Sequence, residues 1–278
     1  MTFDIASLLA RSNELSDISD SPRLDTELLL CHVLGKSRAY LYTWPEYRLL
    51  PAEMAGFDVL FARRAQGEPI AYLTGRREFW SLSLRVSPAT LIPRPETELL
   101  VALALALPLG DAASVADLGT GTGAVALALA SERPLWQISA VDAFPDALAL
   151  AESNRRDLGC GNVRIFQSDW FSALAGSRFD LVVSNPPYID EADTHLQEGD
   201  VRFEPASALV ARDGGIGDLA VIIGKAGEHL NAGGWLMLEH GWQQGDMVRQ
   251  LMNRAGFLAV TTHPDLAGRE RITAGCIA

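Results

Sequence analysis

The sequence predicts an α/β protein with a doubly wound sheet of seven strands, preceded by a small all-helical domain and a β-hairpin connector. Helical spacing without strand alternation runs to about residue 75, aromatic and β-branched residues alternate in 79–91, and strand and helix patterns then alternate to the end of the chain. This last alternation is typical of a sheet with helices on both faces. We therefore expect domains at 1–75 and 97–278, joined by a connector at 76–96.

The amino-terminal part carries the helical pattern in two segments. Apolar residues recur at helical spacing at Leu24, Leu28 and Cys31, and again at Phe57, Leu60 and Phe61. Ser21-Pro22 is a helix start signal and Gly35 a stop signal. A small helical bundle is the expected result. After the alternating segment, Pro93-Arg-Pro95 stiffens the chain because proline fixes φ.

The carboxyl-terminal part alternates between short apolar runs and helical segments. A first short strand is predicted within 114–123, running into a glycine-rich turn, and further strands are predicted at 136–141, 163–167, 179–184, 235–239, 257–262 and 271–277. Helices are predicted at 124–130, 145–158, 218–230 and 244–255. In such sheets, ligands bind at the carboxyl ends of the strands.

The first of these strands ends in a glycine-rich turn that indicates a nucleotide-type cofactor. The candidate contacts in this turn are Asp117, Gly119, Thr120, Gly121, Thr122 and Gly123. Glycines let the backbone approach a ligand closely, although dinucleotide enzymes share this feature. The turn carries Gly119, Gly121 and Gly123 and lacks the third glycine of the dinucleotide fingerprint Gly-x-Gly-x-x-Gly, because position 124 is alanine. This favours S-adenosylmethionine over a pyrophosphate.

Polar residues follow the next two strands as well. Asp142 can accept hydrogen bonds from both ribose hydroxyls, Asp169 can meet an adenine amino group, and Trp170 can offer the ring a flat wall. A single aspartate of this kind more often caps a turn. Four consecutive strand ends with suitable residues, the fourth being Asn185, favour one cofactor site.

The fourth strand ends in Asn185-Pro186-Pro187-Tyr188, which predicts methylation of a planar nitrogen. The side-chain carbonyl of Asn185 and the backbone carbonyl of Pro186 can each accept one hydrogen of an NH2 group. This would orient the nitrogen lone pair toward an incoming methyl group, while Tyr188 stacks on the flat group. The two prolines hold the acceptors still. A plain strand-ending Pro-Pro turn is the alternative for this motif alone.

Further stretches carry a resemblance to a known family. They are Asp117-Leu-Gly-Thr-Gly-Thr-Gly123, Ser184-Asn-Pro-Pro-Tyr-Ile189, Phe203-Glu-Pro205 with Leu209, Gly67-Glu-Pro-Ile-Ala-Tyr-Leu-Thr-Gly75, Glu78-Phe-Trp80 and Leu91-Ile-Pro-Arg-Pro-Glu-Thr-Glu98. With them the chain resembles the bacterial peptide chain release factor glutamine N5-methyltransferases, the PrmC or HemK type, over nearly its whole length. Methyltransferase motifs occur widely, and the stretches before residue 98 single out this family.

The resemblance implies methyl transfer from S-adenosylmethionine to the glutamine of the Gly-Gly-Gln loop of release factors. It implies that Asn185 and Pro186 hold the glutamine amide, and that Gly119 to Gly123, Asp142, Trp170 and Asn185 contact the cofactor. The position of Trp170 varies in the family, and 265–271 fits the family pattern only loosely. We expect the helical domain to recognise the substrate protein and the chain to be a monomer.

Composition is consistent with a soluble cytoplasmic enzyme. The formal net charge is 23 minus 35, or -12, which argues against direct binding of a nucleic-acid backbone. The longest apolar run, 99–109, is too short to span a bilayer. Three scattered cysteines and five histidines show no metal-ligand spacing, so we predict no metal site.

Two other functions remain open. A nucleic-acid adenine methyltransferase uses a similar Asn-Pro-Pro-Tyr motif, because adenine N6 is also a conjugated NH2 group, but it needs a basic groove and a means of extruding the base. A non-catalytic module that retains S-adenosylmethionine as a sensor would show a degraded acceptor motif, whereas residues 185–188 are intact.

Overall fold

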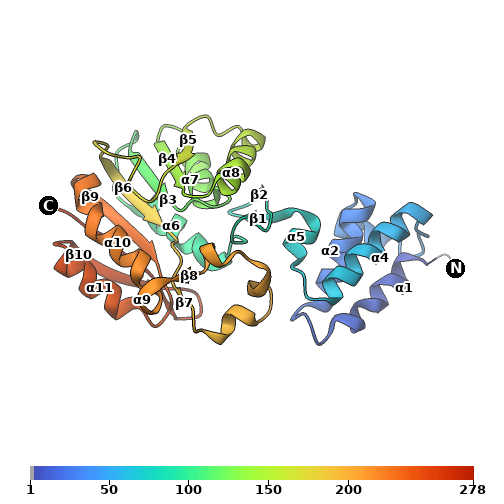
Figure 1. Cartoon of the computed structure of the whole chain (residues 1–278). Helices are drawn as coiled ribbons and strands as arrows, with labels where there is room; N and C mark the ends of the chain where they lie inside the picture. The colour runs from blue at the N-terminus through green and yellow to red at the C-terminus, as the bar shows by residue number, and fades with distance from the viewer. Residues whose placement is uncertain (1–2) are drawn as a thin grey trace. The chain divides into compact units, whose positions relative to one another are not determined.

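The computed structural model describes residues 3–278, which fall into two compact units (Figure 1). The first comprises the chain up to Arg76 together with Gln197–Phe203, and the second comprises Arg77–Leu196 and Glu204–Ala278. The expected domain at 97–278 included residues 197–203, so this segment is grouped differently in the structure. Within the described residues no helix combines the length and the apolar character needed to cross a bilayer.

The first unit is a bundle of short helices around one apolar core. Its helices are α1 (Ile5–Ala10), η1 (Arg11–Leu15), α2 (Pro22–Leu34), α3 (Arg38–Thr43), α4 (Pro51–Ala65) and α5 (Ile70–Thr74). Phe57 and Phe61 of α4 are buried in this core, one turn apart, with ring centroids 5.4 Å from each other. The helical bundle predicted from the sequence is therefore present.

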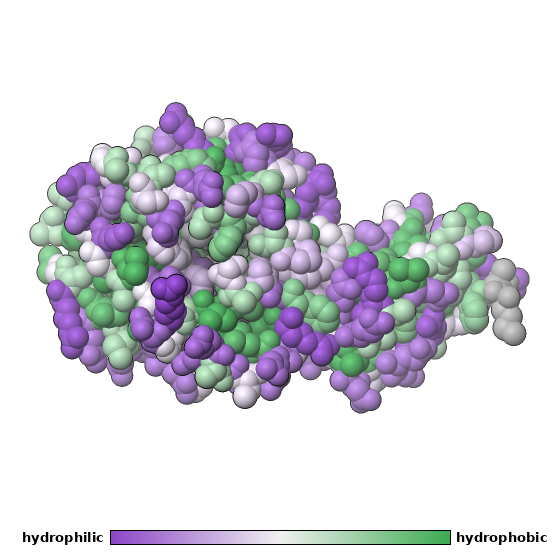
Figure 2. Space-filling model, viewed as in Figure 1, coloured by the Kyte–Doolittle hydropathy of each residue, from purple (hydrophilic) through white to green (hydrophobic). Residues whose placement is uncertain are grey.

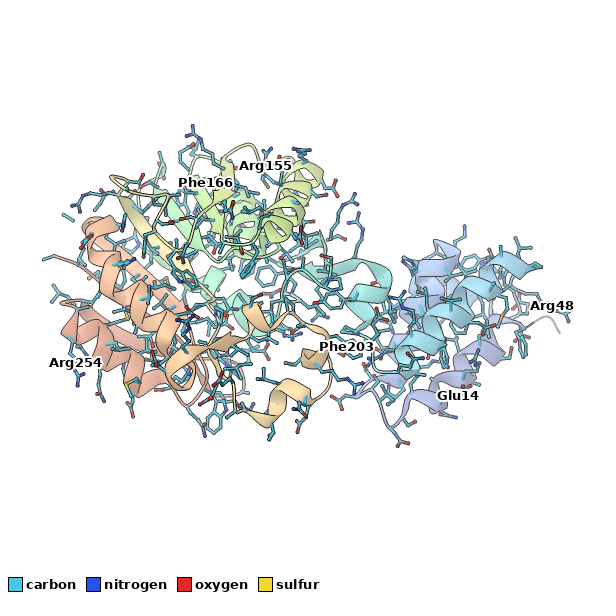
Figure 3. All side chains as sticks on the ribbon, viewed as in Figure 1. Glu14, Arg48, Arg155, Phe166, Phe203 and Arg254 are labelled. Atoms are coloured by element: carbon cyan, nitrogen blue, oxygen red, sulfur yellow. The ribbon has the colours of Figure 1, made fainter. Side chains whose placement is uncertain are left out.

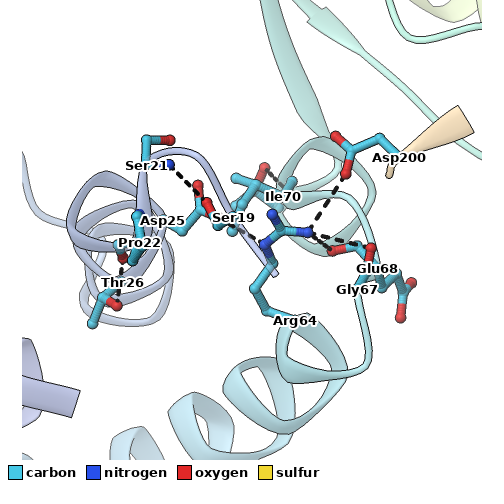
Figure 4. Close-up of polar contacts among 11 residues, drawn as sticks. Ser19, Ser21, Pro22, Asp25, Thr26, Arg64, Gly67, Glu68, Ile70 and Asp200 are labelled. Atoms are coloured by element: carbon cyan, nitrogen blue, oxygen red, sulfur yellow. Dashed lines mark hydrogen bonds and ion pairs between the residues drawn. The ribbon is translucent and has the colours of Figure 1, made fainter. Parts of the chain in front are cut away.

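Helix α2 has the predicted ends but buries a different face. It begins at Pro22 and ends before Gly35, whose φ of +61° is the left-handed conformation that glycine adopts easily. Of the pattern-bearing residues, Leu24 is exposed, whereas Leu29 and Leu30 are fully buried. The buried face includes the carboxylate of Asp25. Its Oδ2 accepts a hydrogen bond from Arg64 Nε of α4 at 2.7 Å (Figure 4).

Segment 197–203 is held to the helical unit by polar contacts of two side chains. Arg64 Nη1 lies 3.5 Å from Asp200 Oδ1 (Figure 4), and Arg202 Nη2 donates to the Gln66 carbonyl at 2.9 Å. Phe203, labelled in Figure 3, is the last residue of this segment, which includes η4 (Val201–Phe203). Both contacts join residues more than a hundred positions apart, so no local pattern could reveal them.

The predicted hairpin is formed by β1 (Arg76–Phe79) and β2 (Leu82–Arg85) and, apart from Arg76, belongs to the second unit. Trp80 and Ser81 connect the strands with φ values of +52° and +60°. Two positive φ values in a two-residue connection match the twist of a hairpin. The predicted alternation continued to residue 91, but strand geometry stops at Arg85 and an irregular, proline-containing segment follows.

The main sheet contains the seven predicted strands in the order β10-β11-β9-β6-β3-β4-β5. Their bounds are β3 (Ser114–Leu118), β4 (Gln137–Asp142), β5 (Val163–Gln167), β6 (Phe179–Ser184), β9 (Leu230–Glu239), β10 (Leu258–Pro264) and β11 (Glu270–Cys276). The sheet is mixed, because β11 runs antiparallel to both of its neighbours. Strand β9 starts five residues before its predicted start; the extra residues include Gly233 and Gly234, which carry no strand signal.

Helices cover both faces of this sheet, as expected for a doubly wound fold (Figure 1). Val115 of β3 packs in one apolar core with α6 (Glu98–Ala106) and α7 (Ala124–Glu132). Ala116, the next residue, packs in a second core with α10 (Gly217–Ala226) and α11 (Gly245–Arg254). Successive strand residues point to opposite faces, so the continuous apolar runs of the sequence fill both cores.

The remaining elements are helix α8 (Pro145–Leu158), which packs on β4 and β5, and several short segments. The short segments are α9 (Arg212–Gly215), β7 (Ile189–Asp190), β8 (Val210–Ala211), η2 (Pro95–Thr97), η3 (Thr194–Gln197), η5 (Ala206–Ala208) and η6 (Gly227–His229). Strands β7 and β8 form a small separate parallel pair after the Asn-Pro-Pro-Tyr loop. Hydrophilic residues are spread over the visible face of both units, with smaller groups of apolar residues between them (Figure 2).

Candidate active site

A cavity of about 300 Å³ lies in the second unit at the carboxyl ends of β3, β4, β5 and β6. It sits where the strand order reverses, since β4 and β5 follow on one side of β3 and β6 lies on the other. The predicted site residues that line it are Asp117, Gly119, Thr120, Gly121, Thr122, Asp142, Asp169, Trp170, Asn185 and Pro187. Gly123, Pro186 and Tyr188 were also predicted and are not part of the lining.

The glycine-rich turn after β3 forms one wall of the cavity. Gly119 and Gly121 have φ values of +69° and +56°, conformations that side chains beyond glycine rarely adopt. Gly123, with φ of +84°, precedes α7, and a Cβ there would lie 3.0 Å from a Leu127 methyl carbon. Gly123 therefore shapes the turn and the start of the helix rather than facing the cavity.

Asp117 of β3 stabilises this turn through hydrogen bonds. Its Oδ2 accepts hydrogen bonds from Thr120 Oγ1 at 2.6 Å and from the Ala126 backbone N–H at 3.2 Å. Burial raises the pKa of this carboxyl to about 6, although both hydrogen bonds oppose the rise. These bonds join β3, the turn and α7, so Asp117 has a clear structural task.

Asp142 ends β4 and reaches across to the glycine turn. Its Oδ2 accepts from the Gly121 N–H at 2.9 Å and its Oδ1 from the Phe144 N–H at 3.0 Å. A carboxylate oxygen has two lone pairs, so each oxygen can still accept one more hydrogen bond. The structure thus leaves Asp142 able to receive two hydroxyl groups from a ligand in the cavity.

Asp169 and Trp170 follow β5 and form the next part of the wall. The Asp169 side chain is exposed at the cavity, which leaves its carboxylate open to a ligand. The Trp170 ring covers Gly119, because a Cβ on that glycine would lie 3.4 Å from ring carbon Cζ3. Trp170 has a positive φ of +47°, so its backbone is held in a conformation that is costly outside glycine.

The charge of the lining favours a positively charged ligand. Four aspartates are among the described lining residues, Asp117, Asp142, Asp169 and Asp218, against one arginine, Arg94. A pyrophosphate would be repelled by this set, whereas a sulfonium or an ammonium group would be attracted. The electrostatics therefore agree with the glycine spacing in disfavouring a dinucleotide.

The opposite wall comes from the segment after the hairpin, to which we assigned no site residue from the sequence. Thr90, Leu91, Pro93, Arg94 and Thr97 all line the cavity. The signal available was the stiff Pro93-Arg-Pro95 run, which holds an arginine between two fixed φ angles. A rigid polar segment of this kind is suited to building a ligand wall.

Glu204 fixes this wall. Its Oε1 accepts from the Ile92 N–H at 3.0 Å, and its Oε2 accepts from Arg94 Nη2 at 2.5 Å. The side chain is buried, and the pair joins positions about 110 apart in the sequence. The long polar segment after the Asn-Pro-Pro-Tyr loop thus contributes directly to the shape of the cavity.

The Asn185-Pro186-Pro187-Tyr188 loop closes the cavity at the end of β6. Asn185 Nδ2 donates to Thr97 Oγ1 at 3.1 Å, which orients the side-chain amide. Pro187 lines the cavity, whereas Pro186 is buried. The predicted stacking surface of Tyr188 is absent from the lining, because its ring packs into the core on the α10 and α11 side of the sheet.

Tyr188 is instead tied to the protein at both ends. Its hydroxyl lies 3.4 Å from Glu239 Oε1, and burial beside this carboxyl raises the pKa of the phenol. Gln244 Nε2 donates to the Tyr188 carbonyl at 2.9 Å. A Cβ at Gly215 would approach that carbonyl oxygen to 2.3 Å, so only glycine fits there. Residues 215, 239 and 244 therefore support the loop, and the sequence patterns gave no sign of them.

Comparison with known proteins identifies close relatives over almost the full length. Residues 8–75 match the PrmC N-terminal domain and residues 96–226 match the methyltransferase small domain. A release factor glutamine methyltransferase from Salmonella typhimurium is 57% identical over 95% of this chain and 95% of its own length. Proteins of the same name from Pseudomonas aeruginosa and Escherichia coli are 57% and 56% identical, over 96% and 92% of this chain and 96% and 93% of their own lengths.

Solved structures share the fold at low sequence identity. A ribosomal protein L11 methylase from Lactobacillus delbrueckii is similar with a TM-score of 0.51 and 20% identity, covering 69% of this chain and 83% of its own. A methyltransferase from Pyrococcus furiosus is similar with a TM-score of 0.52 and 18% identity, covering 78% and 96%. These likenesses concern the arrangement of the strands and helices.

Proposed function

This chain belongs to the release factor glutamine methyltransferase family, and on that premise we propose that it transfers a methyl group from S-adenosylmethionine to the side-chain amide nitrogen of a release factor glutamine. The acceptor is the glutamine of the Gly-Gly-Gln motif. The observation that carries this proposal is the position of Asn185, whose amide is held by Thr97 at the wall of an acidic cavity.

The cavity suits S-adenosylmethionine in size and in chemistry. Its volume of about 300 Å³ is at the lower end of the range of small-molecule sites. Asp142 would hold the ribose hydroxyls with its remaining lone pairs, and the exposed Asp169 would accept from the adenine amino group. The surrounding carboxylates would offset the positive charge of the sulfonium.

The residues of the loop would act by positioning the substrate amide. When bound, S-adenosylmethionine supplies an electrophilic methyl group. Asn185 Oδ1 and the Pro186 carbonyl would each accept one N–H of the glutamine amide, which turns the nitrogen lone pair toward that methyl group. Such preorganisation can lower a barrier by about 7 to 11 kcal/mol, with each hydrogen bond contributing about 1 to 3 kcal/mol.

No strong base is needed before the methyl group is transferred. The amide nitrogen becomes acidic only as it gains the methyl group, so its proton can leave late. Tyr188 is poorly suited to accept that proton, because its raised pKa keeps the phenol protonated and its hydroxyl faces Glu239. The loop residues therefore hold the substrate and do not exchange protons with it.

We assign the two parts of the chain different tasks. The helical domain at 1–75 would bind the body of the release factor, and the methyltransferase domain at 97–278 would bind the glutamine loop and the cofactor. The acidic net charge of -12 makes direct binding to a nucleic-acid backbone unfavourable. A monomer in the cytoplasm, where release factors act, fits this assignment.

Replacement of Asp142 by alanine should weaken S-adenosylmethionine binding. Loss of hydrogen bonds to a charged acceptor costs about 1.5 to 3 kcal/mol, which is roughly a 10- to 150-fold rise in Kd. Calorimetric titration measures this directly. Asp146→Ala is the matched control, because Asp146 is an exposed aspartate in the first turn of α8 outside the cavity lining. An unchanged Kd in a folded Asp142 variant would remove Asp142 from the site.

The reaction is tested by following the methyl group. Cofactor labelled in its methyl group is incubated with the enzyme and either release factor, release factor with the Gly-Gly-Gln glutamine replaced, or duplex DNA. We expect label on the amide of that glutamine and none on the variant or on DNA. Label on adenine would support the nucleic-acid alternative, and cofactor binding without any transfer would support the sensor alternative.

A further inference from the structure

Glu239 is a buried carboxyl to which the mechanism above gives no task. It ends β9 and is 1% exposed. Strand β9 pairs in parallel with β6, and Leu238 lies opposite Ser184, so Glu239 reaches the level of Asn185. Its Oε2 lacks a hydrogen bond of ordinary geometry within residues 3–278. Burying a carboxyl with an incomplete set of partners is costly, which points to a role beyond packing.

Two hydroxyl groups of the candidate site meet this carboxyl. The Tyr188 hydroxyl lies 3.4 Å from Oε1, and the Thr97 hydroxyl is near enough to lower the pKa of the carboxyl as a hydrogen-bonding group. Thr97 is buried, and its Oγ1 also receives the Asn185 Nδ2 donor at 3.1 Å. Glu239, Thr97 and Asn185 can thus form a chain of hydrogen bonds from the core to the cavity wall, in which the Asn185–Thr97 bond is formed in the structure and the Thr97 hydroxyl can turn toward Glu239.

The direction of this chain decides which atom Asn185 presents to the substrate. A threonine hydroxyl has one hydrogen to donate. When that hydrogen goes to an ionised Glu239, Thr97 can only accept from Asn185, so Nδ2 faces Thr97 and Oδ1 stays free for the substrate amide. A protonated Glu239 could donate instead, in which case Thr97 would donate to Oδ1. The amide would then turn its NH2 group toward a substrate that is itself a donor.

The charge of Glu239 is set by its surroundings. Burial raises its pKa to about 7, while the Thr97 hydroxyl, Arg271 and the Tyr188 hydroxyl favour the ionised form and Glu96 disfavours it. These are the titratable and polar groups of the neighbouring elements that act on it most. The carboxyl therefore changes charge close to neutral pH, where the direction of the hydrogen-bond chain would change with it.

We propose, on the basis of the function proposed above, that Glu239 is a positioning residue for methyl transfer. Its carboxylate fixes the direction of the Thr97 hydroxyl, and Thr97 in turn makes Asn185 present its oxygen to the glutamine amide. Glu239 touches neither the substrate nor the cofactor in this arrangement. Its effect should therefore appear in kcat rather than in the affinity for either.

The first test removes the middle of the chain. Thr97→Val keeps the shape but loses the hydroxyl, and we expect kcat to fall about 10- to 100-fold with KM for release factor changed less than about threefold. Thr97→Ser keeps the hydroxyl and should retain most of kcat. Thr273→Val is the matched control. Thr273 is also fully buried in this unit, and its hydroxyl lies 2.8 Å from His240 Nε2, so it takes no part in the hydrogen bonds among Glu239, Thr97 and Asn185. Its kcat should stay near that of the parent.

The second test asks whether the residues act together. Glu239→Leu and Thr97→Val are combined in a double-mutant cycle. We expect kcat of the double variant to be little lower than that of Thr97→Val alone, because either substitution already interrupts the same series of hydrogen bonds. Independent, multiplying effects would overturn the proposal. So would a Thr97→Ser variant as slow as Thr97→Val.

Two measurements distinguish a positioning role of Glu239 from a non-specific disturbance of the site. The affinity for S-adenosylhomocysteine, measured by calorimetry, should stay within about twofold of the parent in the Glu239 variants, because Glu239 is not part of the cavity lining. Lowering the pH from about 8 to about 6 should reduce kcat of the parent, as Glu239 is protonated, whereas Glu239→Gln should be slow without this slope. Burial raises the pKa of Asp117 to about 6, and this carboxyl is present in both proteins, so the difference between the two profiles reports Glu239.

The outcomes also separate this proposal from the function on which it rests. If the parent fails to label release factor, the proposed function is wrong. If the parent labels the glutamine but Thr97→Val and Glu239→Leu both keep the parental kcat, the function stands and the positioning role of Glu239 is wrong. Identical pH profiles for the parent and Glu239→Gln would contradict the role assigned to its charge.

Discussion

Replacing Asn185 with alanine is expected to lower the rate of methyl transfer about a hundred- to a thousandfold. The variant loses one of the two acceptors that we propose orient the substrate nitrogen, and loss of one preorganised polar group at a water-excluded site costs about 2.7 to 4 kcal/mol. Single-turnover assays measure this step directly. Asn253→Ala is the matched control, since Asn253 is exposed on α11, and its rate should equal that of the parent.

Asn185→Asp is the sharper probe of the same site. It keeps size and an acceptor, but it cannot donate to Thr97 as Asn185 Nδ2 does. It also adds a negative charge near the cavity wall, where the lining already holds four aspartates. We expect a folded protein, shown by its melting curve, that has lost much of its activity. A rate near that of the parent in the alanine variant would mean that Asn185 only shapes the turn.

Deleting residues 1–75 is expected to abolish turnover on intact release factor while leaving cofactor binding nearly unchanged. The cavity lining starts at Phe79, so every lining residue remains. The helices α1 to α5, to which we assign recognition of the release factor body, are lost. The truncated protein should therefore lose turnover on whole release factor. Its rate of methylation of a short Gly-Gly-Gln peptide should stay close to that of the full-length protein.

The deletion needs one control, because residues 197–203 group with the helical unit. Their contacts with Arg64 and Gln66 disappear when the helices are removed. A full-length Asp200→Ala/Arg202→Ala variant breaks the same contacts and should keep most of its activity. A folded truncated chain that methylates release factor at the parental rate would show that the helical domain does not recognise the substrate.

Much of the fold was predictable because its signals are local. Each of the seven strands coincides with an apolar run between polar or glycine-containing segments, and α8 begins and ends at the predicted residues 145 and 158. The errors are those of pattern reasoning. The spacing in α2 identified a helix but not its buried face, because the pairing of Asp25 with Arg64 places a charge where an apolar residue is expected.

By itself the sequence determined the elements, the order of the motifs along the chain and the loop to which we assign the acceptor amide. Glycine allows backbone conformations that other residues avoid, and proline fixes φ wherever it occurs, so the turn at 119–123 and the loop at 185–188 could be recognised without knowing their neighbours. The same reasoning placed Asp142 and Asn185 at strand ends, and both line the cavity.

Only the tertiary structure decided which side chains hold those residues in place. Thr97 meets Asn185 across 88 positions, Glu204 meets Ile92 across 112, and Glu239 meets Tyr188 across 51. The sequence predicted that Tyr188 faces the cavity, whereas in the structure its ring packs in the core and its hydroxyl lies 3.4 Å from Glu239 Oε1. Contacts of this kind depend on which strands become neighbours in the sheet, and that is settled by packing of the whole domain rather than by any local run of residues.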